Sequence, residues 1–580
     1  MINRREFIQL LTLASISGLF PRTGFVQSKN FYDFTAEGNT RLLHFTDCHA
    51  QLMPIYFREP HINIGVGSSS GVPPHIVGRH LVKHFNLSKP SHIHAFSSVD
   101  YERAVETFGK VGGFAHLATL VKKLRSEVGE NQSLLLDGGD TWQGSGTALK
   151  TNGMDMVKAC NLLGVDIMTG HWEFTYQDDQ VLKNIAAFEG EFIAQNIYAT
   201  EEALFDGIDV YDEDSGHVFP PYTIKELTHS RVAVIGQAFP YTPVANPKRF
   251  IPNWTFGINE SELQALVNSI KNQHQPDIVV LLSHNGADVD IKMASNISGI
   301  DVILGGHTHD GIPRALEVNN AGGVTLVTNG GSNGKFLGVM DLDIRNGKIQ
   351  HYDYKLLPIF SNLVDTDSAM SNYIEQVRKP HLSWLSEELG MTSSTLYRRG
   401  NFNGTSDQLI CNALIEENDA EISLSPGFRW GTTLPANQMI TMEHVLDQTC
   451  MTYPETYRRE MTGRNLKLIL EDVCDNLFNP NPYYQQGGDM VRVGGMNYSC
   501  KPNESIGHRI ENMTLDNGKP IENDKSYIVA GWATVNEKAP GPPVWEQVAN
   551  YIKRQDSIKI DKVNSPTLVG VEGNLGIDHG

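Results

Sequence analysis

Four short clusters of carboxylate and imidazole side chains follow apolar runs in the first part of this 580-residue chain. In chain order the clusters are Asp47-x-His49, Asp137-Gly-Gly-Asp140, Ser283-His284-Asn285 and Gly306-His307-Thr308-His309. Any one of them is typical of a turn or a helix cap. Together they supply carboxylate and imidazole ligands without a thiolate pair, a donor set that suits Mn, Fe or Zn. The clusters therefore predict a site for two divalent metal ions, with Asp140 as the carboxylate that bridges them.

The spacing within the clusters indicates how the ligands meet. Asp47 and His49 are two residues apart, and side chains at positions i and i+2 of an extended chain point the same way, so both are expected to grip one ion. Cys48 between them then points to the opposite face, where we expect it to pack. The glycines before Asp140 allow the sharp turn that presents its carboxylate. Two such ions would lower the pKa of a bound water, so the predicted chemistry is hydrolysis.

Alternating strands and helices must position these ligands from residue 38 to about residue 355. Short apolar runs that end in Gly, Asp, His or Asn predict strands, and the longer stretches between some of them predict helices. Strands are expected at 41–46, 133–137, 232–236, 278–283, 302–305 and 324–328, and helices at 115–128 and 260–273. This is the pattern of an α/β domain, in which polar residues just past the strand ends carry the chemistry.

The domain organisation follows from the length and from breaks in this pattern. A chain of 580 residues predicts two sizeable domains. We expect the first over 38–360, a linker helix over 366–389 and a second α/β or α+β domain over 390–570. An insertion over 50–111, rich in Pro, Gly and His, lies between two ligand clusters, so we expect it to wall the pocket rather than to fold separately.

The net charge of −20 excludes some partners and leaves others open. It argues against the backbone of a nucleic acid, or an anionic membrane, as the main partner. A locally positive pocket for a small anion is still compatible with this charge. Arg429 and Arg492 are candidates to bind such an anion through charge-assisted hydrogen bonds, with a surface or inter-domain salt bridge as the alternative. We expect the chain to act as a monomer.

Residues 1–30 have the features of an export signal. Asn3-Arg4-Arg5-Glu6-Phe7 resembles a twin-arginine motif, and a mildly apolar stretch follows it at 8–20. This stretch suits a signal peptide but is shorter than the roughly 20 residues that cross a membrane. We therefore expect a periplasmic protein, exported by the twin-arginine pathway without membrane insertion. The six cysteines show no metal-binding spacing, and a disulfide among the last four stays open.

The ordered clusters resemble the motifs of the calcineurin-like metallophosphoesterases. Farther along the chain, Gly427-Phe428-Arg429 and Thr462-Gly463 resemble the C-terminal domain of the 5′-nucleotidases. The two likenesses together cover nearly all of the chain after residues 1–30. They imply that the first domain is a four-layer α/β/β/α metallophosphoesterase sandwich and that the second is a 5′-nucleotidase-like substrate domain.

One motif departs from this family. Where the family usually reads Gly-Asn-His-Glu-Phe-Asp, the chain reads Gly170-His171-Trp172-Glu173-Phe174-Thr175. His171 replaces the usual Asn ligand and can still bind a metal, but Trp172 replaces the catalytic His and Thr175 replaces its supporting Asp. A phosphate monoester expels a strongly basic alkoxide, which a nearby cationic His stabilises or protonates. The altered motif therefore favours a leaving group that is already a stable anion, such as a persulfide.

The departures are similar to those of one branch, the SoxB family of sulfate thiohydrolases in the Sox sulfur-oxidation system. The likeness includes GHWEFTY, the segment YFREPHINIGVG of the insertion, and GGDMVRVGG at 487–495. It implies a cysteine S-thiosulfonate as substrate, borne on the C-terminal arm of the carrier SoxYZ, with sulfate and a carrier persulfide as products. It also implies two Mn²⁺ ions held by Asp47, His49, Asp140, His171, His284, His307 and His309. Asp140 and His171, with Arg429 and Arg492, are the candidate catalytic residues.

Two other functions stay open at this point. The first is a periplasmic 5′-nucleotidase or cyclic-nucleotide phosphodiesterase, which the missing His–Asp pair disfavours. The region that supplies a base-stacking aromatic in nucleotidases is also poorly matched around Met451-Thr452-Tyr453. The second is a metal-stabilised binding protein without turnover, which the complete ligand set disfavours. Trp172 is expected either to line the channel for the carrier arm or to pack in the core.

Overall fold

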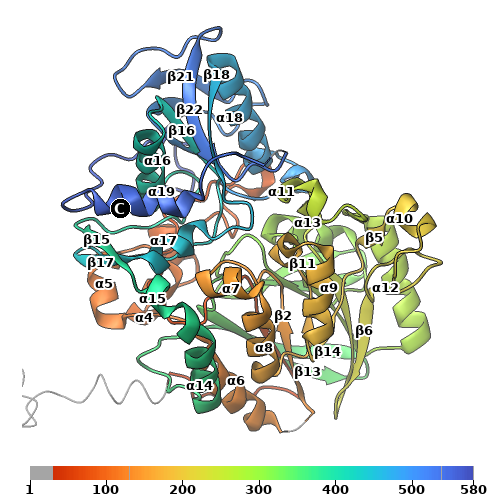
Figure 1. Ribbon diagram of the computed structural model, residues 1–580. Helices are drawn as coiled ribbons and strands as arrows, with labels where there is room; N and C mark the ends of the chain where they lie inside the picture. Colours follow the sequence, from red (N-terminus) through yellow and green to blue (C-terminus); the bar gives the residue numbers. More distant parts are fainter. Residues whose placement is uncertain (1–30, 130, 537, 579–580) are drawn as a thin grey trace, which may run out of the picture.

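The computed structural model (Figure 1) describes residues 31–129, 131–536 and 538–578. The predicted export signal over 1–30 lies outside these ranges. Within them, none of the helices combines the length and the apolar character that crossing a membrane requires. All six cysteines are buried and free, and the Sγ atoms of Cys474 and Cys500 lie 3.6 Å apart.

The first of two six-stranded sheets has the order β14-β13-β1-β2-β3-β4. Its strands are β1 (Thr40–Phe45), β2 (Ser133–Asp137), β3 (Ile167–Met168), β4 (Glu191–Phe192), β13 (Phe336–Arg345) and β14 (Lys348–Pro358). Strands β1 to β4 are parallel, whereas β13 and β14 run antiparallel at one edge. Side chains alternate along β1, so Leu43 and Phe45 face one hydrophobic core and Leu42 faces another.

The second six-stranded sheet has the order β11-β12-β10-β9-β7-β6. Its strands are β6 (Tyr222–Glu226), β7 (Arg231–Gln237), β9 (Ile278–Ser283), β10 (Val302–Gly305), β11 (Leu316–Asn320) and β12 (Gly323–Asn329). The four central strands are parallel, and their middle parts are mostly apolar because both faces of the sheet are covered. Each of the six strands predicted from the sequence is confirmed to within one residue at either end, and so are both predicted helices.

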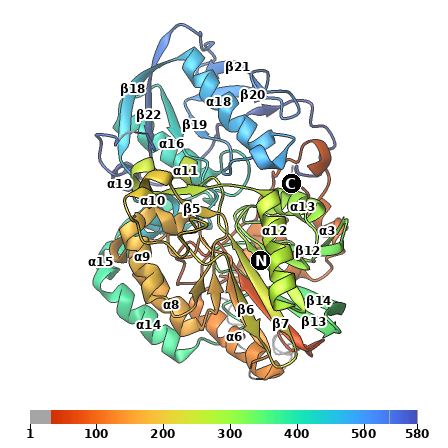
Figure 2. The ribbon, with the colours of Figure 1, turned by 90° about the vertical axis from the view of Figure 1, so that its right-hand side faces the viewer.

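Helices cover the outer face of each sheet (Figure 2). The first sheet packs against α6 (Phe114–Val128), α8 (Met154–Leu163), α9 (Asp178–Ala187) and α14 (Ser368–Arg378), and the second packs against α12 (Glu260–His274) and α13 (Ala287–Asn296). A separate core fills the space between the two sheets, where Leu42 and Leu136 of the first meet Val234 and Val280 of the second. The result is the four-layer α/β/β/α order that the family resemblance implied.

The second half of the chain forms a smaller α/β unit, at the top of Figure 1. Its four-stranded sheet has the order β18-β22-β16-β19, with a three-stranded sheet β21-β20-β23 beside it. The strands are β16 (Ile422–Ser425), β18 (Thr456–Thr462), β19 (Arg492–Gly494), β20 (Met496–Cys500), β21 (Ile510–Leu515), β22 (Ser526–Trp532) and β23 (Thr567–Leu568). The helices are α16 (Thr405–Glu417), α17 (Met442–Thr449), α18 (Gly463–Phe478) and α19 (Val544–Lys553), and β15 (Glu388–Thr392) pairs with β17 (Gln438–Thr441).

Two connections between these halves bear on the site. The segment 366–389 is not one helix, because α14 ends at Arg378 and Pro380 has no N–H with which to continue it, so the short α15 (Leu382–Leu385) follows a turn. The insertion holds α3 (Gly78–His84), α4 (Pro90–Phe96) and α5 (Tyr101–Phe108). Single backbone bridges join its Tyr56 to Thr433 and its Ile62 to Ile577, so the insertion ties the first half to the second.

Short elements surround the ends of the central strands and shape the surface there. They are α7 (Gly146–Thr151), η2 (Trp172–Tyr176), α10 (Glu201–Phe205), α11 (Thr242–Ala245), and the paired strands β5 (Ile197–Ala199) and β8 (Trp254–Phe256).

Candidate metal centre

The predicted ligands all lie just past the carboxyl ends of neighbouring parallel strands. Asp47 follows β1, Asp140 follows β2 and His171 follows β3 in the first sheet. His284 follows β9, and the His307-x-His309 pair follows β10 in the second sheet. Because these strands run in the same direction in each sheet, their carboxyl ends share one edge, and the two edges face each other across the sandwich.

The chain turns sharply at these positions, and this corrects one sequence argument. We expected Asp47 and His49 to share a face because the chain would be extended there, but β1 already ends at Phe45. Five of the predicted ligands have left-handed backbone with φ between 47° and 73°, namely Asp47, His49, Asp140, His307 and His309. A non-glycine residue in this conformation costs roughly 1–2 kcal/mol. Such strain gathers at functional sites, where surrounding contacts hold it in place.

Backbone hydrogen bonds between the ligand loops supply those contacts. The N–H of Asp47 donates to the carbonyl of Gly139 at 2.8 Å, and the N–H of His49 donates to the carbonyl of Asp140 at 3.0 Å. The carbonyl of Asp47 accepts the N–H of Asn333 at 2.7 Å. Backbone hydrogen bonds therefore hold the loops after β1 and β2 together independently of a metal ion.

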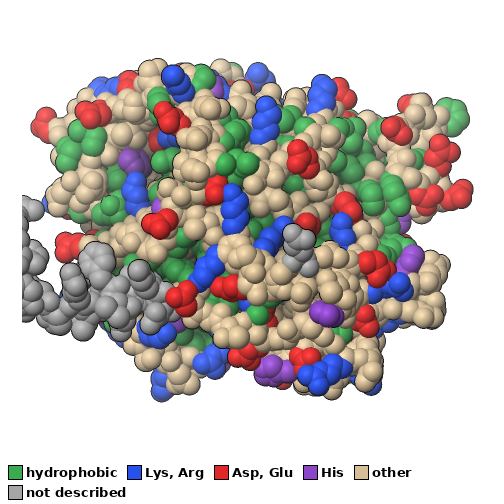
Figure 3. Space-filling view, turned by 90° about the horizontal axis from the view of Figure 1, so that it is seen from below, with side chains coloured by type: hydrophobic (Ala, Val, Ile, Leu, Met, Phe, Trp, Pro, Cys, Tyr) green, Lys and Arg blue, Asp and Glu red, His purple; other side chains and the backbone are tan. Residues whose placement is uncertain are grey.

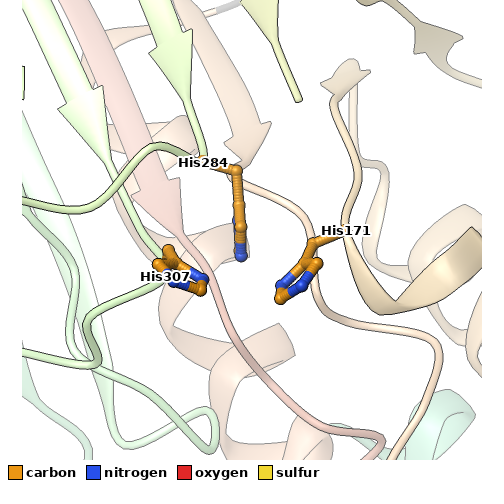
Figure 4. A group of neighbouring side chains, drawn as sticks. All are labelled: His171, His284 and His307. Atoms are coloured by element: carbon orange, nitrogen blue, oxygen red, sulfur yellow. The ribbon is translucent and has the colours of Figure 1, made fainter. Parts of the chain in front are cut away.

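The seven predicted ligands fall into two groups. In each group the ligand atoms lie within 4.8 Å of one another, one group being Asp47, His49, Asp140 and His309, and the other being His171, His284 and His307. Figure 4 shows the three imidazoles of the second group converging from separate loops. Asp140 lies between the groups, because its Oδ2 is 3.4 Å from Nε2 of His49, 3.3 Å from Nδ1 of His171 and 3.7 Å from Nε2 of His284.

The donor atoms fit two cations. All seven side chains are buried. Within the described residues, atoms in both groups have no hydrogen-bond partner, including Oδ1 of Asp140, Nε2 of His284 and both ring nitrogens of His171 and of His307. Burying unpaired polar atoms costs free energy unless something binds them. Imidazole and carboxylate donors with no thiolate suit Mn, Fe or Zn, so the cluster fits a dimetal site.

Burial also sets the protonation of three of the imidazoles, whereas Asp47 and Asp140 outweigh burial at His284 and raise its pKa to about 9. Burial lowers the pKa of His171 and His307 well below the ordinary value, and the neighbouring His284 adds to the effect in both cases. Burial, followed by the neighbouring His309, does the same for His49. These imidazoles are therefore neutral at pH 7 and keep the lone pair that a metal ligand needs.

Glu173 holds two ligand loops together, and the sequence argument had given it no role. Its Oε2 accepts the N–H of His171 at 2.7 Å and that of Asp140 at 3.1 Å, while its Oε1 accepts the N–H groups of Thr141 at 2.7 Å and Trp142 at 3.1 Å. The side chain is wholly buried. The sequence offered one signal for this role, a carboxylate directly after His171 and Trp172.

Two further contacts on His307 were also missed. The Phe239 ring stacks on the His307 imidazole with 4.0 Å between ring centroids. From the second half of the chain, Gly487 has φ +86° and passes so close that a Cβ there would lie 2.5 Å from Nε2 of His307. The GGDMVRVGG segment that carried part of the family resemblance thus touches the metal centre through a position that only glycine fits.

A cavity of about 300 Å³ opens above the metal centre, between the two halves of the chain. Its base includes Asp140, His171, His307 and His309, and its wall includes Trp172, Phe428, Arg429, Trp430 and Tyr453. Among the described residues that line it, none belongs to 50–111, so the expectation that the insertion walls the pocket is wrong.

The insertion instead contacts the outer side of the ligand loops. Asn63 donates to Oδ1 of Asp310 at 3.2 Å, and Nε2 of His75 lies 2.7 Å from Oδ2 of Asp288. Asp310 directly follows a predicted ligand, and Asp288 lies in the first turn of α13. These side-chain contacts, with the bridges to the second half, hold the insertion behind the centre rather than over it.

The two candidate arginines occupy different places. Arg429 lines the cavity, where its Nη2 donates to the carbonyl of Gly488 at 2.8 Å and its Nη1 has no partner among the described residues. Arg492 is completely buried and does not line the cavity. Its guanidinium donates to the carbonyl of Gly400 at 3.0 Å and to Oδ2 of Asp489 at 3.2 Å. Arg492 therefore does not contact an anion in the cavity. Its guanidinium instead forms a structural ion pair with Asp489.

The two substituted positions of the altered motif are both built into η2. Trp172 lines the cavity and also packs edge-to-face on Trp430, at 5.3 Å, so it is both a packed residue and part of the cavity wall. Thr175 is buried, and its Oγ1 lies 2.6 Å from Oγ1 of Thr452 in the second half. Cys48 packs in the first hydrophobic core, as expected.

Several known proteins are similar to this chain. The family model of the 5′-nucleotidase C-terminal domain matches residues 387–545. The trifunctional nucleotide phosphoesterase YfkN of Bacillus subtilis is 25% identical over 468 residues, or 73% of this chain, and rat 5′-nucleotidase is 28% identical over 340 residues, or 53% of it. The chain spans only 31% and 55% of the length of these two relatives.

A solved structure gives the fuller match. The sulfate thiohydrolase SoxB of Thermus thermophilus, solved in complex with glycerol, superposes with a TM-score of 0.86 at 33% identity. The match covers 93% of this chain and 98% of that one, so it includes both halves and the cavity between them. The chain therefore belongs to the SoxB family, within the metallophosphoesterase/5′-nucleotidase superfamily of hydrolases.

Proposed function

We propose that this protein is a sulfate thiohydrolase that acts on a cysteine S-thiosulfonate carried by another protein. The reaction is Cys–S–S–SO₃⁻ + H₂O → Cys–S–S⁻ + SO₄²⁻ + 2 H⁺. The bond between the sulfonate sulfur and its neighbouring sulfur breaks, and its electron pair leaves with the persulfide. Membership of the SoxB family and the fit of the buried cluster to two cations support this proposal.

The observation that carries the proposal is the absence of a proton donor for the leaving group. Apart from the predicted ligands, the titratable side chains among the described residues that line the cavity are Arg429, Tyr453 and Asp489. Tyr453 donates its hydroxyl to the carbonyl of Ala245, and burial raises its pKa far above the ordinary value. Asp489 is paired with both Arg429 and Arg492. An alkoxide leaving group would find no acid here, whereas a persulfide anion needs none.

Residues of the chain itself would bind and orient the substrate. The seven predicted ligands would hold two divalent cations, proposed to be Mn²⁺, which when bound activate water and stabilise a tetrahedral oxyanion. A sulfonate oxygen would give the unpaired Nη1 of Arg429 an acceptor, through a charge-assisted hydrogen bond. Trp172 and Phe428 present ring faces and edges along the wall, which suits an extended segment that enters from outside.

The setting of the reaction is part of the same proposal. The twin-arginine motif at residues 3–7 supports export of the folded enzyme to the periplasm. There the substrate would be borne on the cysteine of a flexible arm of the carrier SoxYZ, as in the Sox system that the family is named for.

Nucleotide hydrolysis is the alternative that the curated relatives favour, because two of the most similar ones are nucleotide phosphoesterases. The cavity offers it little. Phe428, an aromatic residue of the cavity wall, already stacks on Trp430 with ring centroids 3.9 Å apart. One of its two faces is therefore covered, and Trp172 and Trp532 meet it edge-on, each with ring centroids 5.7 Å from that of Phe428.

The deciding experiment offers two substrates in parallel to the Mn²⁺-loaded protein without residues 1–30. One is a synthetic peptide that bears cysteine S-thiosulfonate, and the other is AMP. We expect sulfate from the peptide and negligible phosphate from AMP. Phosphate without sulfate would refute the thiohydrolase proposal and favour the nucleotidase.

A further inference from the structure

A strongly acidic segment projects from the first half of the chain beside the cavity. We call residues 200–217 the acidic lobe; it comprises α10 and the loop that returns to β5. No Lys or Arg occurs between residues 184 and 224. The lobe carries seven carboxylates within fourteen residues, at Glu201, Glu202, Asp206, Asp209, Asp212, Glu213 and Asp214.

These charges face solvent without compensation. Six of the seven carboxylate residues are exposed, and Asp212 is half-buried. In the part of the chain that the structure describes, no Lys or Arg forms an ion pair with any of them. Two aromatic side chains of the lobe are also exposed, Phe205 at 91% and Tyr211 at 59%. Figure 3 shows Asp and Glu side chains gathered with hydrophobic ones at the right-hand end of the molecule, where α10 lies.

A groove lies between the end of β8 and the second half of the chain. It has a volume of about 430 Å³ and is lined by residues that include Tyr241, Val244, Phe256, Tyr483 and Tyr484, which we call the tyrosine groove. Val244 lines both the groove and the cavity, so the two are neighbours on either side of this residue. Phe256 pairs with Ile197 in the β5–β8 sheet, and α10 begins two residues after β5. One small sheet thus joins the lobe to the wall of the groove.

The charge of the lobe is wrong for a free anionic substrate. A sulfonate or a small thiosulfonate would be repelled by uncompensated carboxylates beside the entrance, since like charges raise the free energy of approach. The same field would attract a partner with a cationic surface and speed its encounter with the enzyme. An exposed Phe and Tyr beside those charges would add apolar contact once the partner has docked.

We propose that the acidic lobe and the tyrosine groove form the docking surface for the folded body of the carrier protein. The partner is one that bears Lys and Arg side chains around the base of its cysteine-bearing segment. The lobe receives that basic surface, and the groove leads the segment from it towards the cavity. This inference rests on the proposed function, because it requires a substrate that is attached to a protein.

The test compares a carrier protein with a short peptide that bears the same cysteine S-thiosulfonate. The lobe variant combines Asp209→Asn, Glu213→Gln and Asp214→Asn, which lie outside α10 and leave its first turn intact. A second variant, Phe205→Ser, changes only the exposed ring. The matched control combines Glu504→Gln, Glu522→Gln and Glu572→Gln, three exposed carboxylates of the second half that remove the same charge.

We expect the lobe variant to raise KM for the carrier protein about tenfold at low salt, without changing kcat. Its KM should lose most of the salt dependence that the wild-type enzyme shows, and kcat/KM for the peptide should be unchanged. The control variant should behave as the wild type, and Phe205→Ser should raise KM for the carrier alone.

Two results would overturn the docking surface. If the wild-type enzyme releases sulfate from the peptide while the lobe variant keeps KM for the carrier within twofold of the wild type, the surface is elsewhere and the proposed function stands. If the wild-type enzyme releases sulfate from neither substrate, the proposed function fails, and the docking surface fails with it.

Discussion

The base and the wall of the cavity differ in origin and in how their side chains are held. The base is the metal centre with its seven predicted ligands, all from the first half; four of them line the cavity, five have left-handed backbone, and several have unpaired donor atoms. The wall comes largely from the second half, where Phe428 stacks on Trp430 and Asp489 is paired with Arg429. A base with unpaired donors suits cations and therefore hydrolysis in general. We propose that the wall decides which leaving group the cavity serves.

Removal of the shared carboxylate of the base should have the largest effect. Asp140→Asn takes away the atom that lies between both ligand groups, so we expect loss of bound metal and a fall in kcat on the order of 1,000-fold. Metal content and sulfate release would be measured together. Asp290→Asn is the matched control, since this buried carboxyl bonds Ser283 and is not a predicted ligand. Full activity with metal retained in Asp140→Asn would contradict the ligand assignment.

A change in the wall should shift the choice of substrate. The double variant Trp172→His with Thr175→Asp restores the acid pair that phosphomonoester hydrolysis uses, so we expect phosphate release from AMP to rise about 100-fold. Trp172→His alone is the control, because without the Asp its imidazole lacks support. An unchanged rate with AMP in the double variant would mean that other parts of the wall exclude nucleotides.

A substitution that weakens the support of the ligand loops, without changing a ligand, should have a smaller effect on activity. Glu173→Gln replaces one acceptor oxygen by an NH₂ group that faces backbone N–H donors, so we expect metal affinity to fall by about 10- to 100-fold. Titration with Mn²⁺ would measure this affinity, and saturating metal should restore much of kcat. An affinity equal to that of the wild type would show that the loops hold their shape without this carboxylate.

The two arginines give a comparison within the second half. Arg429→Gln removes the guanidinium that lines the cavity, and we expect KM for the S-thiosulfonate peptide to rise about tenfold with the melting temperature little changed. Arg492→Gln breaks a buried ion pair, so it should lower stability by about 3–5 kcal/mol. Unfolding curves and steady-state kinetics on both variants would test this division. Equal effects on KM at equal stability would contradict it.

The smallest effect on stability is expected from the contact between His75 of the insertion and Asp288 of α13. Burial alone lowers the pKa of His75, but Asp288 outweighs it, so the pKa is raised above the ordinary value. A raised pKa in the folded state contributes stability that is complete below the unfolded value, about 6.5, and is lost as pH rises through the folded one. His75→Gln should therefore cost on the order of 1 kcal/mol at pH 5.5 and less at pH 9. Urea unfolding at both pH values measures this, and a cost that grows with pH would reverse the assignment.

Much of the base could be predicted because its signals are local. The strand at 278–283 is an uninterrupted apolar run, and His284 follows it at once, so one short window gives both the element and the ligand. The same holds for Asp140 after β2 and for His307 after β10. The substitutions at Trp172 and Thr175 could also be recognised from the sequence, because both lie within one motif. Glu173 stayed without a role because its four partners are backbone N–H groups, which every sequence offers.

The sequence by itself determined the α/β order of the first half, the identity of the candidate ligands and the loss of the acid pair at 172 and 175. Periodicity and motif content decide these features, and both are properties of adjacent residues. Only the tertiary structure decided that the ligands form two groups around Asp140, that the insertion lies behind the centre, and that Trp172 packs on Trp430. Each of these depends on strand order and on the packing of the two halves, and contacts between residues hundreds of positions apart leave no pattern in a single chain.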